Sequence, residues 1–276
     1  MAGSLEGRVA FITGVARGQG RAHAVRLARE GADIIGVDIC ADIPSMDYSC
    51  ANEEDLAETV RLVERLDRRI VARKADTRDF AALSAAFQEG YAQFGRVDII
   101  LANAGHIRLG EEVDPITEWR DTLDVCLTGS FHTVRAALPA MIDGGRGGSI
   151  VMTSSTAGLK GTGSDKASPQ AYSAAKRGLV GYMQTLANDL AKHWIRVNTI
   201  HPTGVVSGMT MNPVMQQMFE RAAAGEVTGM ESMQNALPIE ILQPEDIANA
   251  VAFLVSDEAK FITGIQWPLD AGFAVR

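Results

Sequence analysis

The stretch VAFITGVARGQG, residues 9–20, decides the fold of this chain. It begins with a continuous apolar run and then becomes glycine-rich, at Gly14, Gly18 and Gly20. An uninterrupted apolar run is typical of a strand buried on both faces, and glycines let the chain turn tightly where that strand ends. A helical pattern, RAHAVRLAREG, follows directly. The stretch therefore predicts a strand, a tight turn and a helix.

Apolar runs of the same kind recur along the chain, and helical patterns separate most of them. In the segment EEDLAETVRLVERLD, apolar side chains fall at spacings of three and four, and acidic residues open the helix. Strands that alternate with helices indicate a parallel sheet, because parallel neighbours need crossover connections. The predicted strands are VAFIT, DIIGVD, RIVARKAD, VDIILANAG, GSIVMTSS and IRVNTIHP.

Two stretches look like loops. The first is GLKGTGSDKASP, residues 158–169, and the second runs from Ser207 to about Pro238. The second stretch holds six of the eleven methionines of the chain. Methionine is flexible and polarizable, so the segment suits either contact with a bulky apolar ligand or ordinary helix packing. These methionines are Met209, Met211, Met215, Met218, Met230 and Met233.

The composition limits the classes of function. The chain has 276 residues and is 46% hydrophobic, which suits one domain spanning residues 1–276. A formal net charge of −8 argues against nucleic-acid binding, which needs clustered Lys and Arg. No apolar stretch is long enough for a membrane helix and the N-terminus lacks a signal-peptide pattern, so we expect a cytoplasmic protein. The three cysteines and five histidines are dispersed, so we expect no metal site.

The glycine turn favours a dinucleotide cofactor, although a tight turn in another α/β protein would also explain the glycines alone. Glycines let the backbone approach a pyrophosphate, and the N-terminus of the following helix attracts the anion. Asp38 ends the second predicted strand, 18 residues after Gly20, where a carboxylate binds ribose hydroxyls and repels a 2′-phosphate. Arg17 could pair with that phosphate, but it has the pyrophosphate as an alternative partner. Asp38 therefore favours NAD over NADP.

Tyr172 and Lys176 lie one turn apart on the predicted helix AYSAAKRGLVGYMQTLANDLAKHW. Free tyrosine has a pKa of about 10, so its use as a base at neutral pH requires roughly 4 kcal/mol of stabilisation of the anion. An ammonium about 4 Å away supplies an energy of that order. The spacing is common by itself and also fits an exposed helical pair, so its meaning depends on the other motifs.

Taken together, the motifs resemble those of the short-chain dehydrogenase/reductase family over nearly the whole chain. They are, in order, TGVARGQG, Asp38, KADTRD, NAG at 103–105, TSSTAG, YSAAK and HPTG. The resemblance implies an α/β fold with a Rossmann-type, doubly wound parallel sheet of about seven strands and helices on both faces. It also implies a homotetramer assembled through helices around residues 116–142 and 169–193.

Further segments look like the carveol-dehydrogenase-like, mycofactocin-associated branch of that family. They are ARGQGRAHAVRLAREGADIIGVDIC, GGRGGSIVMTSS and HPTGV. The likeness to this branch implies an NAD cofactor retained between turnovers. It also implies that electrons leave through mycofactocin, an external redox carrier.

The family resemblance assigns roles to single residues. Tyr172 would be the general base, Lys176 would lower the pKa of Tyr172 and hold the nicotinamide ribose, and Ser155 would hydrogen-bond the substrate oxygen. A substrate lid would lie at about residues 207–240. The other residues expected to bind the cofactor are Gly14, Arg17, Gly18, Gln19, Gly20, Asp38, Ile39, Asp76, Thr77, Asn103, Ala104, Gly105, Pro202, Gly204, Val205 and Ser207.

Two features depart from the family pattern. Cys126 stands where the family usually has Asn, whose main-chain carbonyl holds a water of the proton relay. A main-chain role survives a change of side chain, so we expect altered proton transfer rather than an inert protein. A nucleophilic Cys126 is the alternative, but no adjacent base is evident and a buried inert thiol explains it better. Ser155 and Tyr172 lie 17 residues apart, a longer spacing than is usual, and we expect the extra residues, near 161–168, at the mouth of the site.

These observations favour an NAD-dependent dehydrogenase that interconverts a bulky apolar secondary alcohol and its ketone. Two alternatives stay open. One is an NADPH-dependent ketone or 3-oxoacyl reductase, which Asp38 opposes. The other is a catalytically silent nucleotide-sensing protein, which Cys126 alone supports.

Overall fold

The computed structural model describes residues 3–161, 164–226 and 234–276. Within these residues the chain forms a seven-stranded sheet in which all neighbouring strands are parallel, in the order β3-β2-β1-β4-β5-β6-β7. The predicted doubly wound parallel sheet is confirmed. The strands are β1 Val9–Thr13, β2 Asp33–Asp38, β3 Ile70–Lys74, β4 Ile99–Ala102, β5 Gly148–Thr153, β6 Ile195–Pro202 and β7 Gln266–Leu269.

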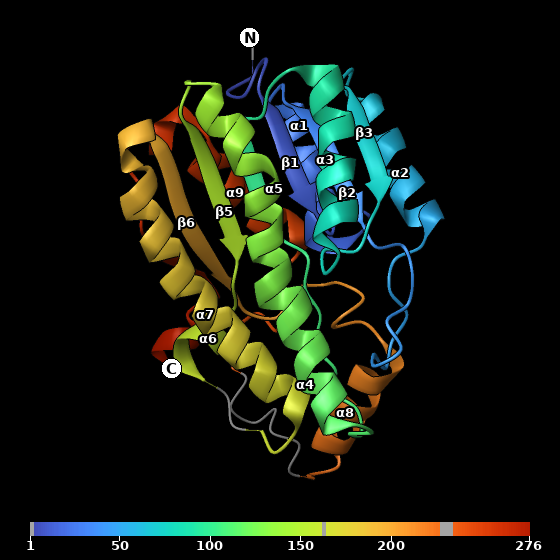
Figure 1. Ribbon diagram of the computed structural model, residues 1–276. Helices are drawn as coiled ribbons and strands as arrows, with labels where there is room; N and C mark the ends of the chain where they lie inside the picture. Colours follow the sequence, from blue (N-terminus) through green and yellow to red (C-terminus); the bar gives the residue numbers. More distant parts are fainter. Residues whose placement is uncertain (1–2, 162–163, 227–233) are drawn as a thin grey trace.

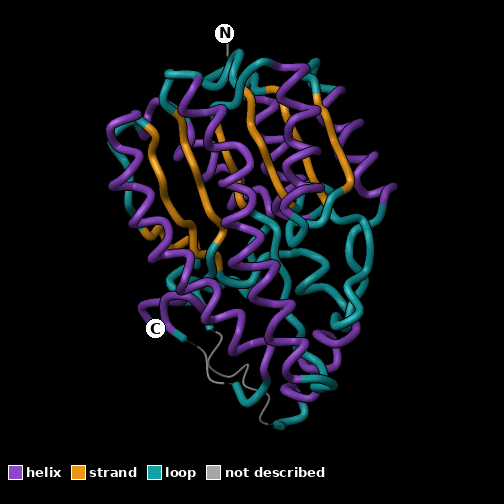
Figure 2. Tube along the Cα trace, viewed as in Figure 1, coloured by secondary structure: helices purple, strands orange, loops and turns teal. Residues whose placement is uncertain are grey.

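Helices cover both faces of this sheet (Figures 1 and 2). One layer consists of α1 (Gly18–Arg29), α2 (Glu53–Glu64) and α9 (Pro244–Val255), and the other of α3 (Phe80–Phe94), α5 (Gly129–Asp143) and α7 (Ala167–Leu190). Outside these layers lie α4 (Pro115–Leu123), α6 (Ala157–Lys160), α8 (Pro213–Ala223) and short turns of helix.

Alternation along the strands divides the interior into two cores. In β1, Ala10 and Ile12 pack against α1, α2 and α9, whereas Val9 and Phe11 pack against α3, α5 and α7. Successive side chains of a strand point to opposite faces, so an apolar residue at every position supplies both cores. This is the physical reason that an unbroken apolar run marks a central strand.

Three expectations about local structure were incomplete. The segment 158–169 begins inside α6 and ends inside α7, and the segment after Ser207 contains α8. The helical region at 116–142 is divided by one π-helical turn, Asp124–Thr128, between α4 and α5. Within the described ranges, no helix combines the length and apolar character needed to cross a membrane.

His23 makes the stability of this fold depend on pH. Its side chain is 1% exposed in α1, Nδ1 has no hydrogen-bond partner, and burial lowers the pKa from 6.5 to about 4. As the pH falls below 6.5 the unfolded chain binds a proton that the folded chain excludes, so folding is weakened until about pH 4. This shift corresponds to about 3 kcal/mol.

We therefore expect His23→Leu to reduce the loss of stability between pH 7 and pH 4. Urea denaturation of both proteins at the two pH values measures the difference. An equal loss in wild type and variant would show that other groups cause the acid sensitivity.

Candidate active site

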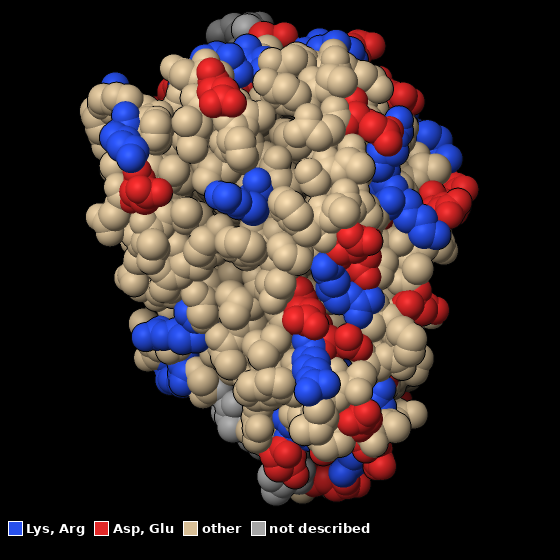
Figure 3. Space-filling view, viewed as in Figure 1, with Lys and Arg blue, Asp and Glu red and all other residues tan. Residues whose placement is uncertain are grey.

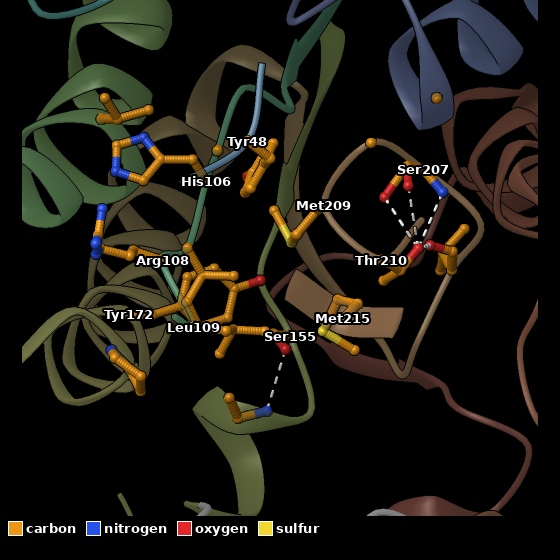
Figure 4. A pocket seen from close by; sticks show the side chains of 18 of the residues that line it. Tyr48, His106, Arg108, Leu109, Ser155, Tyr172, Ser207, Met209, Thr210 and Met215 are labelled. Carbon is orange, nitrogen blue, oxygen red and sulfur yellow. Dashed lines mark hydrogen bonds between the residues drawn. The ribbon is translucent and has the colours of Figure 1, made fainter. Parts of the chain in front are cut away.

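One cavity of about 1030 Å³ lies at the carboxyl ends of the strands. The segments that follow β1, β2, β3, β4, β5 and β6 line it, together with residues from α7 and α8. Strand order reverses between β1 and β4, and ligands of open parallel sheets bind at such a crevice. The cavity is therefore the candidate active site (Figure 4).

The structure brings nearly all residues predicted for the site to this cavity. Cys126 is the exception, because it does not line the cavity. The predicted residues that do line it are Gly14, Arg17, Gly18, Gln19, Gly20, Asp38, Ile39, Asp76, Thr77, Asn103, Ala104, Gly105, Ser155, Tyr172, Lys176, Pro202, Gly204, Val205 and Ser207.

The turn after β1 requires glycine for different reasons at two of its positions. Gly18 has a φ of +54°, in the left-handed region, where side chains are disfavoured. Gly20 lies so close to the chain that an added Cβ would stand 1.9 Å from the Gly14 carbonyl oxygen. The first glycine allows the turn and the second allows α1 to pack against β1, which brings the helix N-terminus to the cavity.

Asp38 holds the glycine turn in addition to facing the cavity. Its carboxylate accepts hydrogen bonds from the main-chain N–H groups of Ala16, at 2.9 Å, and Cys40, at 3.3 Å. Burial raises the pKa of Asp38, and these hydrogen bonds oppose that shift. Arg17 lies in the same turn, and its guanidinium donates to the Ser49 carbonyl at 2.6 Å.

Tyr172, Lys176 and Ser155 line the same cavity, and Figure 4 shows Tyr172 and Ser155 side by side. Tyr172 and Lys176 lie one turn apart on α7, and Lys176 Nζ is 5.3 Å from the centroid of the tyrosine ring. Lys176 is 2% exposed and donates to the Thr153 carbonyl at 2.7 Å. Ser155 follows β5, and its Oγ accepts a hydrogen bond from Ala157 N at 3.2 Å.

Burial is the largest cause of the pKa shifts of Tyr172 and Lys176. It raises the pKa of Tyr172, with the hydrogen bond from Ser155 acting in the opposite direction, and it lowers the pKa of Lys176. The resemblance implied a lowered pKa for Tyr172. Burial shifts the pKa of Tyr172 upward, and a positive charge beside the ring would favour the phenolate and oppose this shift.

Cys126 lies behind the cavity wall in the π-helical turn, and it is fully buried. Its Sγ donates to the His106 carbonyl at 3.2 Å, and its own carbonyl accepts a hydrogen bond from Ser130 Oγ at 2.9 Å. The thiol therefore ties the π-helical turn to the segment after β4. This arrangement supports a structural role for the side chain.

We expect Cys126→Asn to raise kcat by a few fold, because an amide at this position restores the residue that the family usually has. The measurement is steady-state alcohol oxidation by the variant and the wild type, with NAD binding as the control for folding. An unchanged or lower kcat would count against a role of Cys126 in proton transfer.

Residues 39–52 lie between β2 and α2, and we call this segment the strap. The sequence reasoning predicted only its first residue, Ile39, for the site and missed the others. Ile43, Asp47, Tyr48 and Cys50 of the strap line the cavity. The available signal was length, because connections in α/β units usually have about 2 to 6 residues. In Figure 1 the strap runs from the sheet toward α8.

Methionines of the segment after Ser207 also reach the cavity. Met209, Met215 and Met218 line it, whereas Met211 is 65% exposed. Figure 4 shows the side chains of Met209 and Met215 among those that surround the cavity with Tyr172 and Ser155. Met230 and Met233 fall outside the described residues, so the predicted lid of residues 207–240 is described only in part.

The lining residues fit a dinucleotide. The glycine turn, Asp38 and the group of Tyr172, Lys176 and Ser155 all line this one cavity. Gln19 Oε1 is buried without a partner at the same cavity, which suits a side chain that bonds a bound molecule. In the part of the chain that the structure describes, no group of three or more His, Cys, Asp or Glu could hold a metal ion.

Comparisons with known proteins agree with this geometry. The family model described as enoyl-(acyl carrier protein) reductase matches residues 14–274. The chain is 53% identical over 269 residues to an uncharacterized oxidoreductase of Mycobacterium tuberculosis, covering 98% of this chain and 97% of the relative. It is 43% identical over 279 residues to (−)-trans-carveol dehydrogenase of Rhodococcus erythropolis, covering 99% of each.

A solved structure is similar over the same length. It is carveol dehydrogenase from Mycobacterium avium in complex with NAD, with a TM-score of 0.90 and 45% identity. The match covers 99% of this chain and 100% of that chain.

Proposed function

The chain belongs to the short-chain dehydrogenase/reductase family of oxidoreductases, and from this premise we propose that it is an NAD-dependent dehydrogenase of bulky apolar secondary alcohols. The observation that carries the proposal is the meeting of Tyr172, Lys176 and Ser155 in one cavity with the glycine turn and Asp38. The NAD complex of carveol dehydrogenase from Mycobacterium avium supports the choice of cofactor.

The residues of this chain divide the work of alcohol oxidation. Ser155 Oγ hydrogen-bonds the substrate oxygen and places the hydroxyl at Tyr172, whose phenolate accepts the hydroxyl proton. Lys176, fixed through the Thr153 carbonyl, would hold the nicotinamide ribose and keeps positive charge beside the phenolate. An oxidised nicotinamide bound in the cavity would accept the hydride from the carbinol carbon, and its positive charge would favour the phenolate. Thr153 thus acts by orienting Lys176.

The cavity suits an uncharged substrate. Two cations at its mouth are already bound to the protein: Arg108 donates to the carbonyls of Ser45 and Glu111 and lies 3.3 Å from Glu118, and Lys166 donates to two main-chain carbonyls. Met209, Met215 and Met218 add flexible apolar side chains to the lining. A bulky apolar alcohol would be accepted there without a charged partner.

The strap supports retention of NAD between turnovers. Its Ser49 carbonyl is bound by Arg17 of the glycine turn, and its Ser45 hydroxyl donates to Asp121 of α4 at 2.5 Å. A cofactor under this segment would leave only after such contacts open. Retention would require an external electron acceptor, and mycofactocin is the acceptor that we propose.

The proposal includes a cytoplasmic homotetramer. Apolar side chains of α4 and α5 support assembly on this face, because Ile116 is 60% exposed, Trp119 37% and Phe131 45%. Figure 3 shows few charged side chains over α5 and α7. Patches of this kind often mark contacts between subunits.

The test is nicotinamide fluorescence of the purified protein when carveol or cyclohexanol is added, first alone and then with free NAD or an electron-accepting dye. A single burst that only the dye converts to turnover supports a retained cofactor and an external acceptor. Steady turnover with free NAD would remove those two parts of the proposal. Preference for NADPH would favour a reductase, and cofactor binding without turnover of any alcohol would favour a nucleotide sensor.

A further inference from the structure

Two charged side chains from distant segments form hydrogen bonds with the main chain of the same two residues at the mouth of the cavity. We call these four hydrogen bonds the grip. The two residues are Leu109 and Gly110, in the segment between β4 and α4. Asp47 approaches them from the strap, and Lys166 approaches from the residues just before α7. All four residues line the cavity.

The two side chains bind opposite groups of the main chain. Asp47 Oδ2 accepts hydrogen bonds from Leu109 N at 3.2 Å and Gly110 N at 2.5 Å. Lys166 Nζ donates to the Leu109 carbonyl at 3.0 Å and the Gly110 carbonyl at 2.8 Å. A carboxylate on the N–H groups and an ammonium on the carbonyls are the charge-assisted arrangements that main-chain dipoles favour.

The hydrogen bonds from Asp47 also require glycine at position 110, because a side chain there would collide with the carboxylate. A Cβ added to Gly110 would stand 2.6 Å from Asp47 Oδ2 and 3.5 Å from Val214 Cγ1 of α8. The strap, the segment after β4 and α8 therefore pack closely at this point. Lys166 is one of the extra residues between Ser155 and Tyr172, and its hydrogen bonds to Leu109 and Gly110 place it at the cavity.

We infer that Asp47 and Lys166 are positioning residues for substrate specificity, because they fix Leu109 as one wall of the alcohol-binding half of the cavity. Leu109 lines the cavity together with Tyr172 and Ser155 (Figure 4). An alcohol with a large ring substituent would contact this wall, whereas a small cyclic alcohol would bind without it. The inference rests on the proposed function.

The test compares Asp47→Ala and Lys166→Ala with the wild type, using carveol as the large alcohol and cyclohexanol as the small one. Each variant is expected to raise the KM for carveol about tenfold, since small misplacement of a binding group weakens binding substantially. The kcat for carveol and the KM for cyclohexanol should change less than about twofold. Asp47→Asn and Lys166→Arg keep one of the contacting groups and should restore part of the affinity.

Two further variants distinguish the loss of the hydrogen bonds of the grip from a general loss of order in the strap. The first is Asp42→Ala, on the same strap. Among the described hydrogen bonds, the Asp42 carboxylate accepts only from Cys50 N, within the strap itself. This variant should therefore leave the KM for carveol unchanged. The double variant of Asp47 and Lys166 should raise KM by less than the product of the single effects, because both side chains act on the same two residues.

Hydrogen exchange gives a readout that does not depend on activity. The amides of Leu109 and Gly110 should exchange at least about tenfold faster in Asp47→Ala and Lys166→Ala, because each variant removes a main-chain contact. Unchanged exchange, or an equal KM effect in Asp42→Ala, would overturn the inference. If the wild type oxidises neither alcohol, the proposed function fails. Faster amide exchange in the two alanine variants would still show that Asp47 and Lys166 hold Leu109 and Gly110 in place.

Discussion

Tyr172→Phe is expected to lower the kcat for alcohol oxidation by about 10³-fold or more, because a phenyl ring cannot accept the hydroxyl proton. The ring itself is retained, so packing against Lys176 and binding of NAD should persist, with the Kd for NAD changed less than about threefold. Steady-state oxidation of carveol and fluorescence titration with NAD measure the two quantities.

The pH profile makes this expectation specific. Burial raises the pKa of Tyr172, so below that pKa the reactive phenolate grows about tenfold for each pH unit. Wild-type kcat/KM for oxidation should therefore increase with pH, and the residual rate of Tyr172→Phe should not. Tyr182→Phe is the matched control, since Tyr182 lies on the same helix but does not line the cavity. A Tyr172→Phe variant with near-normal kcat would exclude Tyr172 as the base.

Asp38→Asn is expected to reduce the preference for NAD over NADP by about 10- to 100-fold, because the negative charge that repels a 2′-phosphate is removed. The amide oxygen of Asn still accepts one of the two hydrogen bonds, so the fold should be retained. Asp38→Ala should in addition lower the free energy of unfolding by about 1 to 3 kcal/mol, because the N–H groups of Ala16 and Cys40 lose their acceptor.

The ratio of kcat/KM for the two cofactors and urea denaturation measure these effects. Asp33→Asn is the control, because Asp33 lies at the other end of β2 and does not line the cavity. An unchanged cofactor ratio in Asp38→Asn would mean that another residue of the turn, with Arg17 the first to examine, sets the discrimination.

Much of the fold could be predicted because the relevant signals are local. Six strands carry apolar runs that need no knowledge of their neighbours, and the glycine turn marks the first strand by its spacing. The strand at Gln266–Leu269 was not identified, since it is short, contains Pro268 and lies at the edge of the sheet, where burial is incomplete. The helix α8 was missed in a segment whose methionines fit either a loop or a helix.

The site divides in the same way. The sequence by itself determined the residue types at the glycine turn and at Asp38 and the pairing of Tyr172 with Lys176, because strand ends and helical turns place these residues at fixed local spacings. Only the tertiary structure decided that strap residues beyond Ile39 line the cavity, that the Cys126 thiol bonds the His106 carbonyl, and that Asp47 and Lys166 hold Leu109 and Gly110. These contacts join segments far apart in the chain, and their geometry depends on packing that no local pattern encodes.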